Sequence, residues 1–208
     1  MKLIGMLDSP YVRRVAISLK LLGLPFEHEA LSVFRTFEAF RRINPAVKAP
    51  TLVCDDGEVL MDSTLILEYA EALARPRTLM PSDPKALQHE LRLIGLALAA
   101  TEKSVQIYYE RDLRPPEKQH APWLERITGQ LGAAYGALEQ EISRHPLAVD
   151  AARMRQSGVT TAVAWCFTQG TIPGVLSPED YPNLAVHSAA AERLPAFRAA
   201  PFGDGTCN

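Results

Sequence analysis

The sequence predicts two domains of different class, an α/β domain over residues 1–75 and an all-helical domain over residues 85–208. Alternating strand and helix signals in the first part predict the order β-α-β-α-β-β-α. Proline, arginine, serine and aspartate then gather in residues 76–84, and we interpret this segment as a linker. Beyond it, apolar residues recur only at helical spacing, which predicts a bundle of helices.

The N-terminus carries the clearest signals of the first domain. Residues 2–7 are mostly apolar and predict a strand. Ser9 is a favoured N-cap, and Pro10 suits the first helical turn because its missing N–H costs little there. Apolar residues then recur at helical spacing until Gly23, a typical C-terminal cap. A strand followed by a helix that ends at Gly23 is therefore expected.

The remaining elements follow from the same kinds of signal. Residues 55–58 place aspartate and glycine between two apolar runs, which is typical of a β-hairpin. The elements expected in the first domain are a strand over 26–31, a helix over 38–43, strands over 51–54 and 59–61, and a helix over 63–73. In the second domain, apolar stripes predict helices over 87–108, 124–142, 162–167 and 184–192.

Composition excludes several classes of function. Hydrophobic residues make up 47% and charged residues 22%, as in a globular protein, and the net charge of −2 argues against nucleic-acid binding. We expect no membrane span, because no apolar stretch approaches about 20 residues, and no signal peptide. Three dispersed cysteines favour a reducing, cytoplasmic compartment. The histidines are never at ligand spacing, so no metal site is expected.

Three ordered segments resemble the cytosolic glutathione S-transferase family, particularly its bacterial serine-type branch. They are Ser9-Pro10-Tyr11-Val12-Arg13-Arg14, Asn44-Pro45-Ala46-Val47-Lys48-Ala49-Pro50 and Asp62-Ser63. Tyr181-Pro182-Asn183-Leu184 and Arg193-Leu194-Pro195-Ala196-Phe197 are similar to the family's C-terminal ending, so the resemblance covers nearly the whole chain. It implies a thioredoxin-like domain that holds glutathione, a helical domain that supplies the pocket for a small hydrophobic electrophile, and a homodimer.

Ser9 has two interpretations. From its position alone it is a helix N-cap. The resemblance implies instead that its hydroxyl donates a hydrogen bond to the glutathione thiolate, helped by the positive end of the following helix. A free thiol has a pKa near ~8.5, so only a few per cent is ionised at neutral pH without such help. Ser9 would then be a catalytic donor and not a base, because a serine hydroxyl is too weak a base.

The Ala49-Pro50 turn would bind the middle of the tripeptide. X–Pro bonds are trans in all but about 5% of cases, but the resemblance implies a cis bond here. Such a turn exposes the N–H and C=O of Ala49 for pairing with the cysteinyl part of glutathione. Lys48 is either a solvated surface lysine or a partner for the glycyl carboxylate.

Asp62 and Ser63 open a helix, so either could be merely a cap. The resemblance gives both a role in binding the γ-glutamyl end. Ser63 and the helix N-terminus would donate to its carboxylate, and Asp62 would accept from its ammonium group.

The second-substrate pocket is less well specified. Candidates are Tyr11 in the first domain and Tyr108, Tyr109 and Arg111 near the end of the first long helix. Phe34 and Arg35 would border the ligand from the loop after the second strand. Trp165 is expected in the core, Cys54 as a buried inert thiol and Cys207 as an exposed one.

One feature departs from the family pattern. Family members usually carry a Ser/Thr-x-x-Asp capping box in the helical domain. Thr160 matches its first position, but Val163 stands where aspartate is expected. We therefore expect the reciprocal hydrogen bond to be missing, at a cost of about 1 kcal/mol.

The resulting function is a glutathione transferase that passes the glutathione thiolate to an electrophile, with glutathione as co-substrate. Two alternatives stay open. One is a glutathione-dependent disulfide or peroxide reductase, which is less favoured because Ser9 stands where redox relatives carry a cysteine. The other is a non-catalytic, partner-binding relative, which is less favoured because Ser9, Ala49-Pro50 and Asp62-Ser63 are all present.

Overall fold

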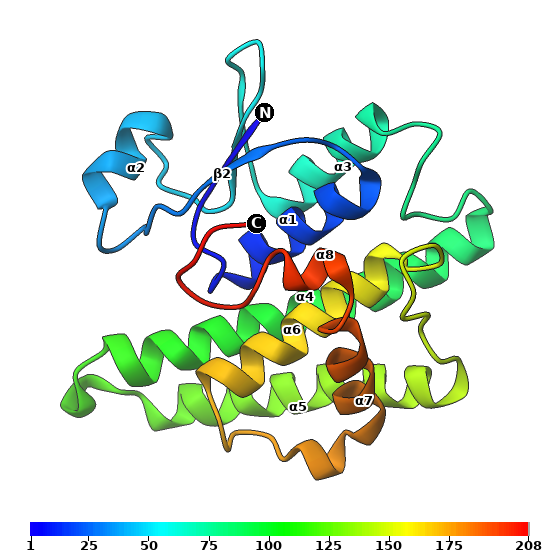
Figure 1. The fold of residues 1–208 in the computed structure, drawn as a ribbon. Coiled ribbons are helices and arrows are strands. Elements are labelled where there is room, and N and C mark those ends of the chain that lie inside the picture. The colour runs from blue at the N-terminus through cyan, green and yellow to red at the C-terminus, as the bar shows by residue number, and fades with distance from the viewer. Residues whose placement is uncertain (208) are drawn as a thin grey trace. The chain divides into compact units, whose positions relative to one another are not determined.

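The computed structural model describes residues 1–207, which form two compact units. The first unit contains Met1–Leu79 together with the C-terminal segment from Arg193, and the second contains Met80–Glu192. The predicted fold class is confirmed: a small mixed sheet with helices makes up the first unit, and helices alone make up the second (Figure 1).

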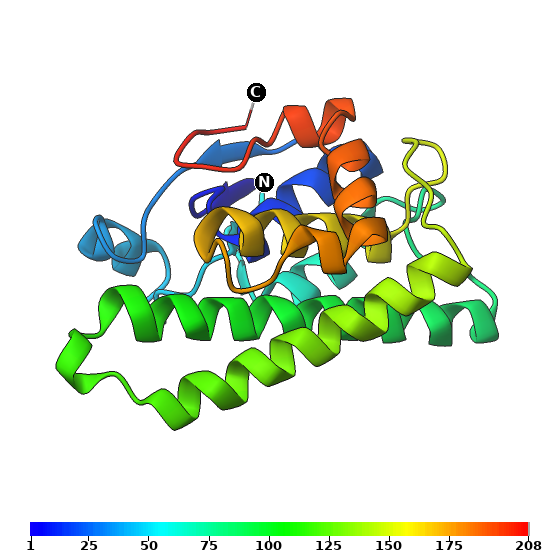
Figure 2. The ribbon, with the colours of Figure 1, turned by 90° about the horizontal axis from the view of Figure 1, so that it is seen from below.

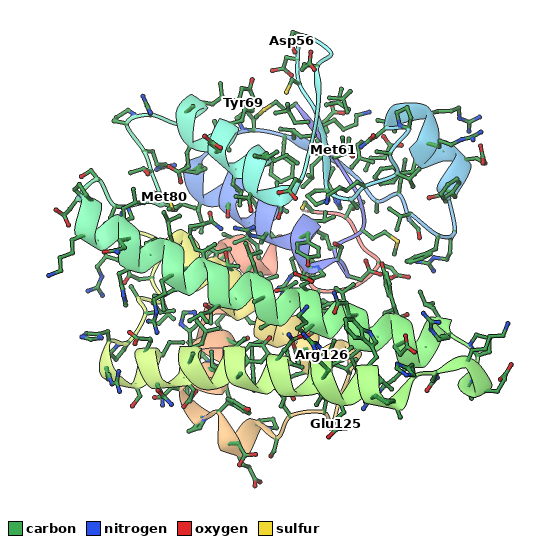
Figure 3. The ribbon with its side chains drawn as sticks, turned by 180° about the vertical axis from the view of Figure 1, so that it is seen from behind. Asp56, Met61, Tyr69, Met80, Glu125 and Arg126 are labelled. Carbon is green, nitrogen blue, oxygen red and sulfur yellow. The ribbon has the colours of Figure 1, made fainter. Side chains whose placement is uncertain are left out.

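The sheet of the first unit has four short strands in the order β2-β1-β3-β4. They are β1 (Lys2–Ile4), β2 (Glu27–Glu29), β3 (Thr51–Val53) and β4 (Val59–Met61). β1 pairs parallel with β2 and antiparallel with β3, so that Leu3 lies between His28 and Leu52. β3 and β4 form the predicted hairpin, with Asp56 at its tip and Met61 at its far end (Figure 3).

Four helices complete the first unit: α1 (Pro10–Leu22), α2 (Phe37–Ile43), α3 (Ser63–Leu73) and α8 (Pro195–Arg198). α1 and α3 lie side by side on one side of the sheet, and α2 lies on the other (Figure 1). α1 begins at the predicted N-cap and ends at Gly23, whose φ of 73° is readily available only to glycine. The local signals therefore set both ends of the helix that follows β1.

The C-terminal segment packs on α1, which differs from its predicted place in the helical domain. Arg13 is fully buried and donates from Nε to the backbone oxygen of Ala200 at 2.8 Å. Its guanidinium carbon also lies 5.9 Å from the ring centroid of Phe197 in α8. A buried guanidinium must find acceptors, and Arg13 finds one in a segment 187 residues away along the chain.

The second unit consists of α4 (Pro84–Tyr108), α5 (Ala121–Arg144), α6 (Gln156–Thr171) and α7 (Pro182–Ala191), with short helical turns η1 (Tyr109–Leu113), η2 (Pro116–Lys118) and η3 (Pro178–Asp180) between them. α4 runs to one end of the unit, and α5 returns alongside it (Figure 2). Trp165 lies in the core between these helices, as predicted, with its ring centroid 5.1 Å from that of Tyr135.

The match of Thr160 to the first position of a capping box is wrong, because Thr160 does not stand at the start of a helix. α6 begins one turn earlier, at Gln156, so Thr160 lies inside the helix and its hydroxyl donates to the Gln156 carbonyl at 2.8 Å. The start of α6 is satisfied from another helix, since Glu90 in α4 accepts from the Ser157 N–H at 2.6 Å. Both residues are buried.

α7 begins in the same way. Glu139 of α5 accepts from the backbone N–H groups of Asn183 and Leu184, each at 2.9 Å. The second unit therefore satisfies the first N–H groups of two helices with glutamates from neighbouring helices.

His187 of α7 is buried, and its surroundings favour the neutral imidazole. Its Nε2 lies 3.0 Å from the Gly158 carbonyl oxygen and so must carry the hydrogen, while its Nδ1 is buried without a partner. Burial lowers the pKa of this imidazole, and the Gly158 hydrogen bond opposes that shift only in part. Protonation would place an unpartnered N–H and a charge in the core.

Two of the cysteine predictions can be compared with the structure. Cys54 is buried as predicted, and burial raises the pKa of its thiol, partly offset by a hydrogen bond with Tyr69 of α3. Cys207 is half-buried and not exposed, because its backbone N–H donates to His28 Nδ1 at 3.0 Å. None of the helices in residues 1–207 combines the length and the apolar character that crossing a bilayer requires.

Replacing Glu90 by alanine should lower the free energy of unfolding by about 2 kcal/mol, because the buried Ser157 N–H loses its acceptor. Glu90→Gln keeps an acceptor oxygen and should cost less than about half of that. Denaturant unfolding of both variants is the measurement. Equal losses of unfolding free energy in the two variants would mean that the charge of Glu90, and not its hydrogen bond to the Ser157 N–H, stabilises the protein.

Stability should fall on acidification through the pKa range of His187. A free histidine has a pKa of about 6.5, and the folded-state pKa lies below it, so between the two values the unfolded state binds more protons. Neutral His187 therefore contributes to the free energy of unfolding above about pH 6.5. This contribution is lost as the pH falls towards the pKa of His187 in the folded state. Denaturant unfolding from neutral to mildly acidic pH should show a weaker pH dependence in His187→Gln; identical profiles would refute this assignment.

Candidate functional site

Ser9 lies at the junction of the β1 loop and α1. Its backbone is extended, and its Oγ accepts from the Val12 N–H at 3.4 Å, a long cap contact. The side chain is half-buried, and the first turn of α1 carries no acidic residue. The hydroxyl hydrogen of Ser9 is not used by this contact, so the residue caps the helix and keeps a donor beside the positive end of α1.

The turn before β3 contains a cis Ala49–Pro50 bond, as the resemblance implied. Two hydrogen bonds hold this turn on β3. Asn44 Nδ2 donates to Thr51 Oγ1 at 2.8 Å, and Thr51 Oγ1 donates to the Lys48 carbonyl at 2.7 Å. Ala49 is half-buried, and its neighbour Pro50 is buried.

Gly5 brings this turn next to the start of α1. A Cβ atom at this glycine would lie 2.6 Å from a Val12 methyl carbon and 3.2 Å from the Ala49 Cβ. The φ of 135° at Gly5 is also one that other residues rarely adopt. Gly5, directly after β1, therefore lets the helix and the turn approach closely, which places Ala49 near the first turn of α1.

Asp62 and Ser63 stand at the N-terminus of α3. Asp62 is the N-cap and accepts from the Thr64 N–H at 2.9 Å, in a backbone conformation with φ of 74°. Val47, beside the cis bond, has a φ of 48°. Among the described residues, these two are the non-glycine positions with positive φ. Such backbone strain often marks a functional site.

Lys48 connects the turn with α3. Its ammonium lies 3.6 Å from Asp62 Oδ2, and both side chains are about half-exposed. An ion pair of this kind contributes little to stability, but it holds the turn and the Asp62 carboxylate on one side of the unit.

Arg14 connects α1 with the same helix end, and sequence reasoning assigned it no role. It is buried, and its Nη1 donates to Ser63 Oγ at 3.0 Å and to Thr64 Oγ1 at 3.3 Å. Burial lowers its pKa to about 10, with Asp62 opposing that shift. The signal that could have revealed it is its helical position, three residues after Tyr11 and one before the buried Val15.

The start of α1, the cis turn and the start of α3 thus lie close together. Gly5 is close to both Val12 of α1 and Ala49 of the turn. Lys48 contacts Asp62, and Arg14 contacts Ser63. We call the region of Ser9, Lys48, Ala49, Pro50, Asp62 and Ser63 the candidate site.

The loop after β2 meets the C-terminal segment. Arg35 donates from Nη2 to Asp204 Oδ2 at 2.8 Å and also lies 3.5 Å from the sulfur of Met6. Asp8, next to Ser9, has its pKa raised by burial and by Asp204. Phe34 is exposed. Asp204 of the C-terminal segment therefore contributes to the electrostatics around Asp8.

The predicted second-substrate residues are divided between the units. Tyr11 is a half-buried residue of α1. Tyr108 and Tyr109 lie at the end of α4 with ring centroids 6.1 Å apart, and Arg111 is exposed in η1. Tyr108 and Tyr109 are thus brought together within the second unit. In the part of the chain that the structure describes, no group of acidic, histidine and cysteine side chains could hold a metal ion.

Several known proteins are similar to this chain in sequence. Residues 3–78 match the family model for the glutathione S-transferase N-terminal domain. The chain is 29% identical to maleylacetoacetate isomerase of Pseudomonas aeruginosa over 202 residues, covering 93% of this chain and 82% of that protein. It is 26% identical to the uncharacterized GST-like protein YibF of Escherichia coli over 174 residues, covering 84% and 86% of the two chains.

A solved structure extends the likeness to the whole fold. A glutathione S-transferase from Methylobacterium radiotolerans, in complex with glutathione sulfonate, superimposes with a TM-score of 0.88 at 26% identity, covering 97% of this chain and 95% of that one. The chain therefore has the glutathione S-transferase fold, and its first unit matches the N-terminal domain of that family.

Replacing Gly5 by alanine should destabilise the protein by about 2 kcal/mol or more, since strain and a clash with Val12 add. Gly57 in the β3–β4 hairpin is the matched control, because it also has positive φ but nothing lies within 4 Å of an added Cβ. Denaturant unfolding should show a clearly larger loss for Gly5→Ala than for Gly57→Ala. Equal losses would mean that the close approach of α1 and the turn is not tight.

Proposed function

We propose that this protein binds glutathione at the candidate site and transfers its thiolate to a small hydrophobic electrophile. The observation that carries the proposal is the set of contacts that joins the start of α1, the cis turn and the start of α3. Together these provide a hydroxyl donor, an exposed backbone pair and a charged helix end for one extended tripeptide.

Ser9 would act on the sulfur. Its Oγ accepts the Val12 N–H and leaves the O–H free, so it can donate to a thiolate while it still caps α1. The positive end of α1 adds to this effect because it favours an anion at the same place. Together they would lower the thiol pKa from its usual ~8.5 and raise the fraction of nucleophilic thiolate at neutral pH.

Ala49 would hold the cysteinyl backbone. The hydrogen bonds from Thr51 to Lys48 and from Asn44 to Thr51 fix the turn before a ligand arrives. A peptide that pairs with the N–H and C=O of Ala49 therefore meets a preorganised partner, which reduces the entropic cost of binding.

The two ends of the tripeptide would meet opposite charges. Asp62 would accept from the γ-glutamyl ammonium group, and Ser63 with the N-terminus of α3 would donate to its carboxylate. Lys48 already lies 3.6 Å from Asp62 and is exposed, so it can turn towards the glycyl carboxylate at little cost.

The relatives support glutathione chemistry. The structure from Methylobacterium radiotolerans binds glutathione sulfonate. With Ser9 proposed to face the thiol, we propose the serine-type branch and favour transfer over disulfide or peroxide reduction. Tyr11, Tyr108, Tyr109 and Arg111 are proposed to line the electrophile's pocket. A homodimer in the cytoplasm, acting in detoxification, fits this proposal.

Isomerisation is a second candidate. It is favoured by the likeness to maleylacetoacetate isomerase, which covers 93% of this chain. A thiolate that adds reversibly to a conjugated double bond allows rotation about the resulting single bond before it leaves. The same candidate site would serve, since the thiolate is needed in both reactions.

Ser9→Ala should raise the pKa of the bound glutathione thiol towards ~8.5. It should also slow conjugation of chlorodinitrobenzene about tenfold or more, because a hydrogen bond to a charged group is lost. The thiolate is followed by its ultraviolet absorbance as the pH is raised, and turnover by product formation.

Two further variants separate the donor from the cap. Ser9→Thr keeps both roles and should behave as the parent protein does. Ser9→Asp caps the helix equally well but offers no hydroxyl, so it should lose activity without losing stability. An unchanged thiol pKa in Ser9→Ala would reduce Ser9 to a helix cap.

A further inference from the structure

The His28 side chain of β2 is hydrogen-bonded through both ring nitrogens. Its Nε2 lies 2.7 Å from the Gly5 carbonyl oxygen, and the Cys207 backbone N–H donates to its Nδ1 at 3.0 Å. A carbonyl oxygen only accepts and a backbone N–H only donates, so Nε2 must carry the ring hydrogen and Nδ1 must be bare. The two contacts therefore exist together only while the imidazole is neutral.

The Cys207 contact fixes the end of a segment that we call the C-terminal strap, residues 200–207. The strap follows α8, begins on α1 and ends beside β2 (Figure 1). Midway along it, Asp204 forms an ion pair with Arg35 at 2.8 Å. The two side chains of this pair are 65% and 64% exposed, so the pair contributes little to stability. The contact with His28 is half-buried and is the firmer attachment of the last residues of the strap.

The acidic groups next to His28 along the chain lie on the other face of β2. Successive residues of a strand point to opposite faces, so Glu27 and Glu29 lie on the face opposite His28. There both carboxylates pair with Lys2 of β1, at 3.8 and 3.5 Å from its Nζ. Their charges are therefore directed towards Lys2 and away from the imidazole.

The groups on the side of the imidazole favour the neutral ring. Burial lowers the pKa of His28 below its usual value of about 6.5; the hydrogen bond to Gly5 opposes this shift, and Lys20 of α1 adds to it. The strap brings the Cys207 thiol, whose pKa is raised by burial, so this thiol is uncharged at neutral pH. A charged imidazole would therefore lie half-buried near a second cation.

Protonation of His28 would break its contact with the strap. In the imidazolium both ring nitrogens carry hydrogen, so Nδ1 would become a donor that faces the N–H donor of Cys207. The Gly5 contact would survive, because Nε2 donates in both states. We propose that His28 is a pH-dependent switch that holds the end of the C-terminal strap when it is neutral and releases it when it is protonated.

The switch lies next to the candidate site without belonging to it. His28 contacts Gly5, which lets α1 and the cis turn approach closely. Burial and the charge of Asp204, a residue of the strap, raise the pKa of Asp8, which directly precedes Ser9. Protonation of His28 therefore leaves Asp204 less firmly held beside Asp8. The inference goes beyond the proposed function, since the switch needs no bound glutathione.

The direction of the pH dependence follows from the two states of the strap. The attached strap favours the neutral imidazole, so the attachment has its full strength above about pH 6.5. It is lost as the pH falls through the lower pKa of His28 in the attached state. The end of the strap should therefore be ordered at neutral pH and mobile in mildly acidic solution.

Nuclear magnetic resonance of protein labelled with ¹⁵N at cysteine and histidine tests the switch. One sample then reports both the backbone N–H of Cys207 and the protonation of the His28 ring. Cys54, whose N–H donates to the Glu58 carbonyl, and Cys166 within α6 are internal references for the folded state. As His28 titrates, the order parameter of the Cys207 N–H should fall from about 0.85 to below about 0.6, while the two references stay high.

Two variants separate the two contacts of His28. Asparagine places an amide oxygen near the position of Nδ1, so His28→Asn should keep Cys207 ordered at neutral and at mildly acidic pH. Glutamine reaches the position of Nε2 and donates to Gly5 but offers the strap no acceptor, so His28→Gln should leave Cys207 mobile at both. His187→Gln in the second unit is the matched control, because it removes another buried histidine and should leave the Cys207 transition unchanged.

An ordered Cys207 N–H after His28 has been protonated would overturn the inference. A Cys207 N–H that is already mobile at neutral pH would do the same, as would a transition in His28→Asn identical to that of the parent protein. Simultaneous loss of order at Cys207, Cys54 and Cys166 would mean that His28 titrates only as the chain unfolds, which also contradicts a switch in the folded protein. If a His28 variant does not fold, the titration of the parent protein still decides between these outcomes.

Discussion

The architecture of the candidate site depends on the close approach of three backbone segments at Gly5. A side chain there would meet Val12 at 2.6 Å and Ala49 at 3.2 Å, so only glycine lets α1 and the cis turn lie against the end of β1. Hydrogen bonds of Asn44 and Thr51 hold the turn on β3. Lys48 of the turn forms an ion pair with Asp62 at the start of α3. The absent side chain at Gly5 thus lets the start of α1 and the cis turn at Ala49 lie close together.

The charges around the candidate site form a pattern that a ligand can match. The starts of α1 and α3 both carry the positive end of a helix dipole, and buried Arg14 adds a full positive charge beside Ser63. Asp62 and the half-buried Asp8 are the opposing carboxyl groups, with burial raising the pKa of Asp8. A ligand with a thiolate at one point, and a carboxylate next to an ammonium group at another, matches this pattern better than a ligand of uniform charge.

The sequence predicted those features whose causes are local. The start of α1 at Ser9 and Pro10, its end at Gly23 and the hairpin around Gly57 all follow from the residues at those positions. Features caused by distant residues were missed. The helical pattern did not reveal that Arg14 would be buried against α3, that Glu90 would cap α6 or that Arg13 would draw Ala200 to the first unit. The cis state of Pro50 came from the family resemblance, since local preference favours trans.

The most direct test of the account is a crystal structure of this chain with glutathione bound. We expect the sulfur within hydrogen-bonding distance of Ser9 Oγ and the cysteinyl backbone paired with Ala49. The γ-glutamyl carboxylate should lie on the Ser63 hydroxyl and the first N–H groups of α3, with the Arg14 contact to Ser63 retained. A tripeptide bound elsewhere, or bound here with its sulfur turned away from Ser9, would contradict the account.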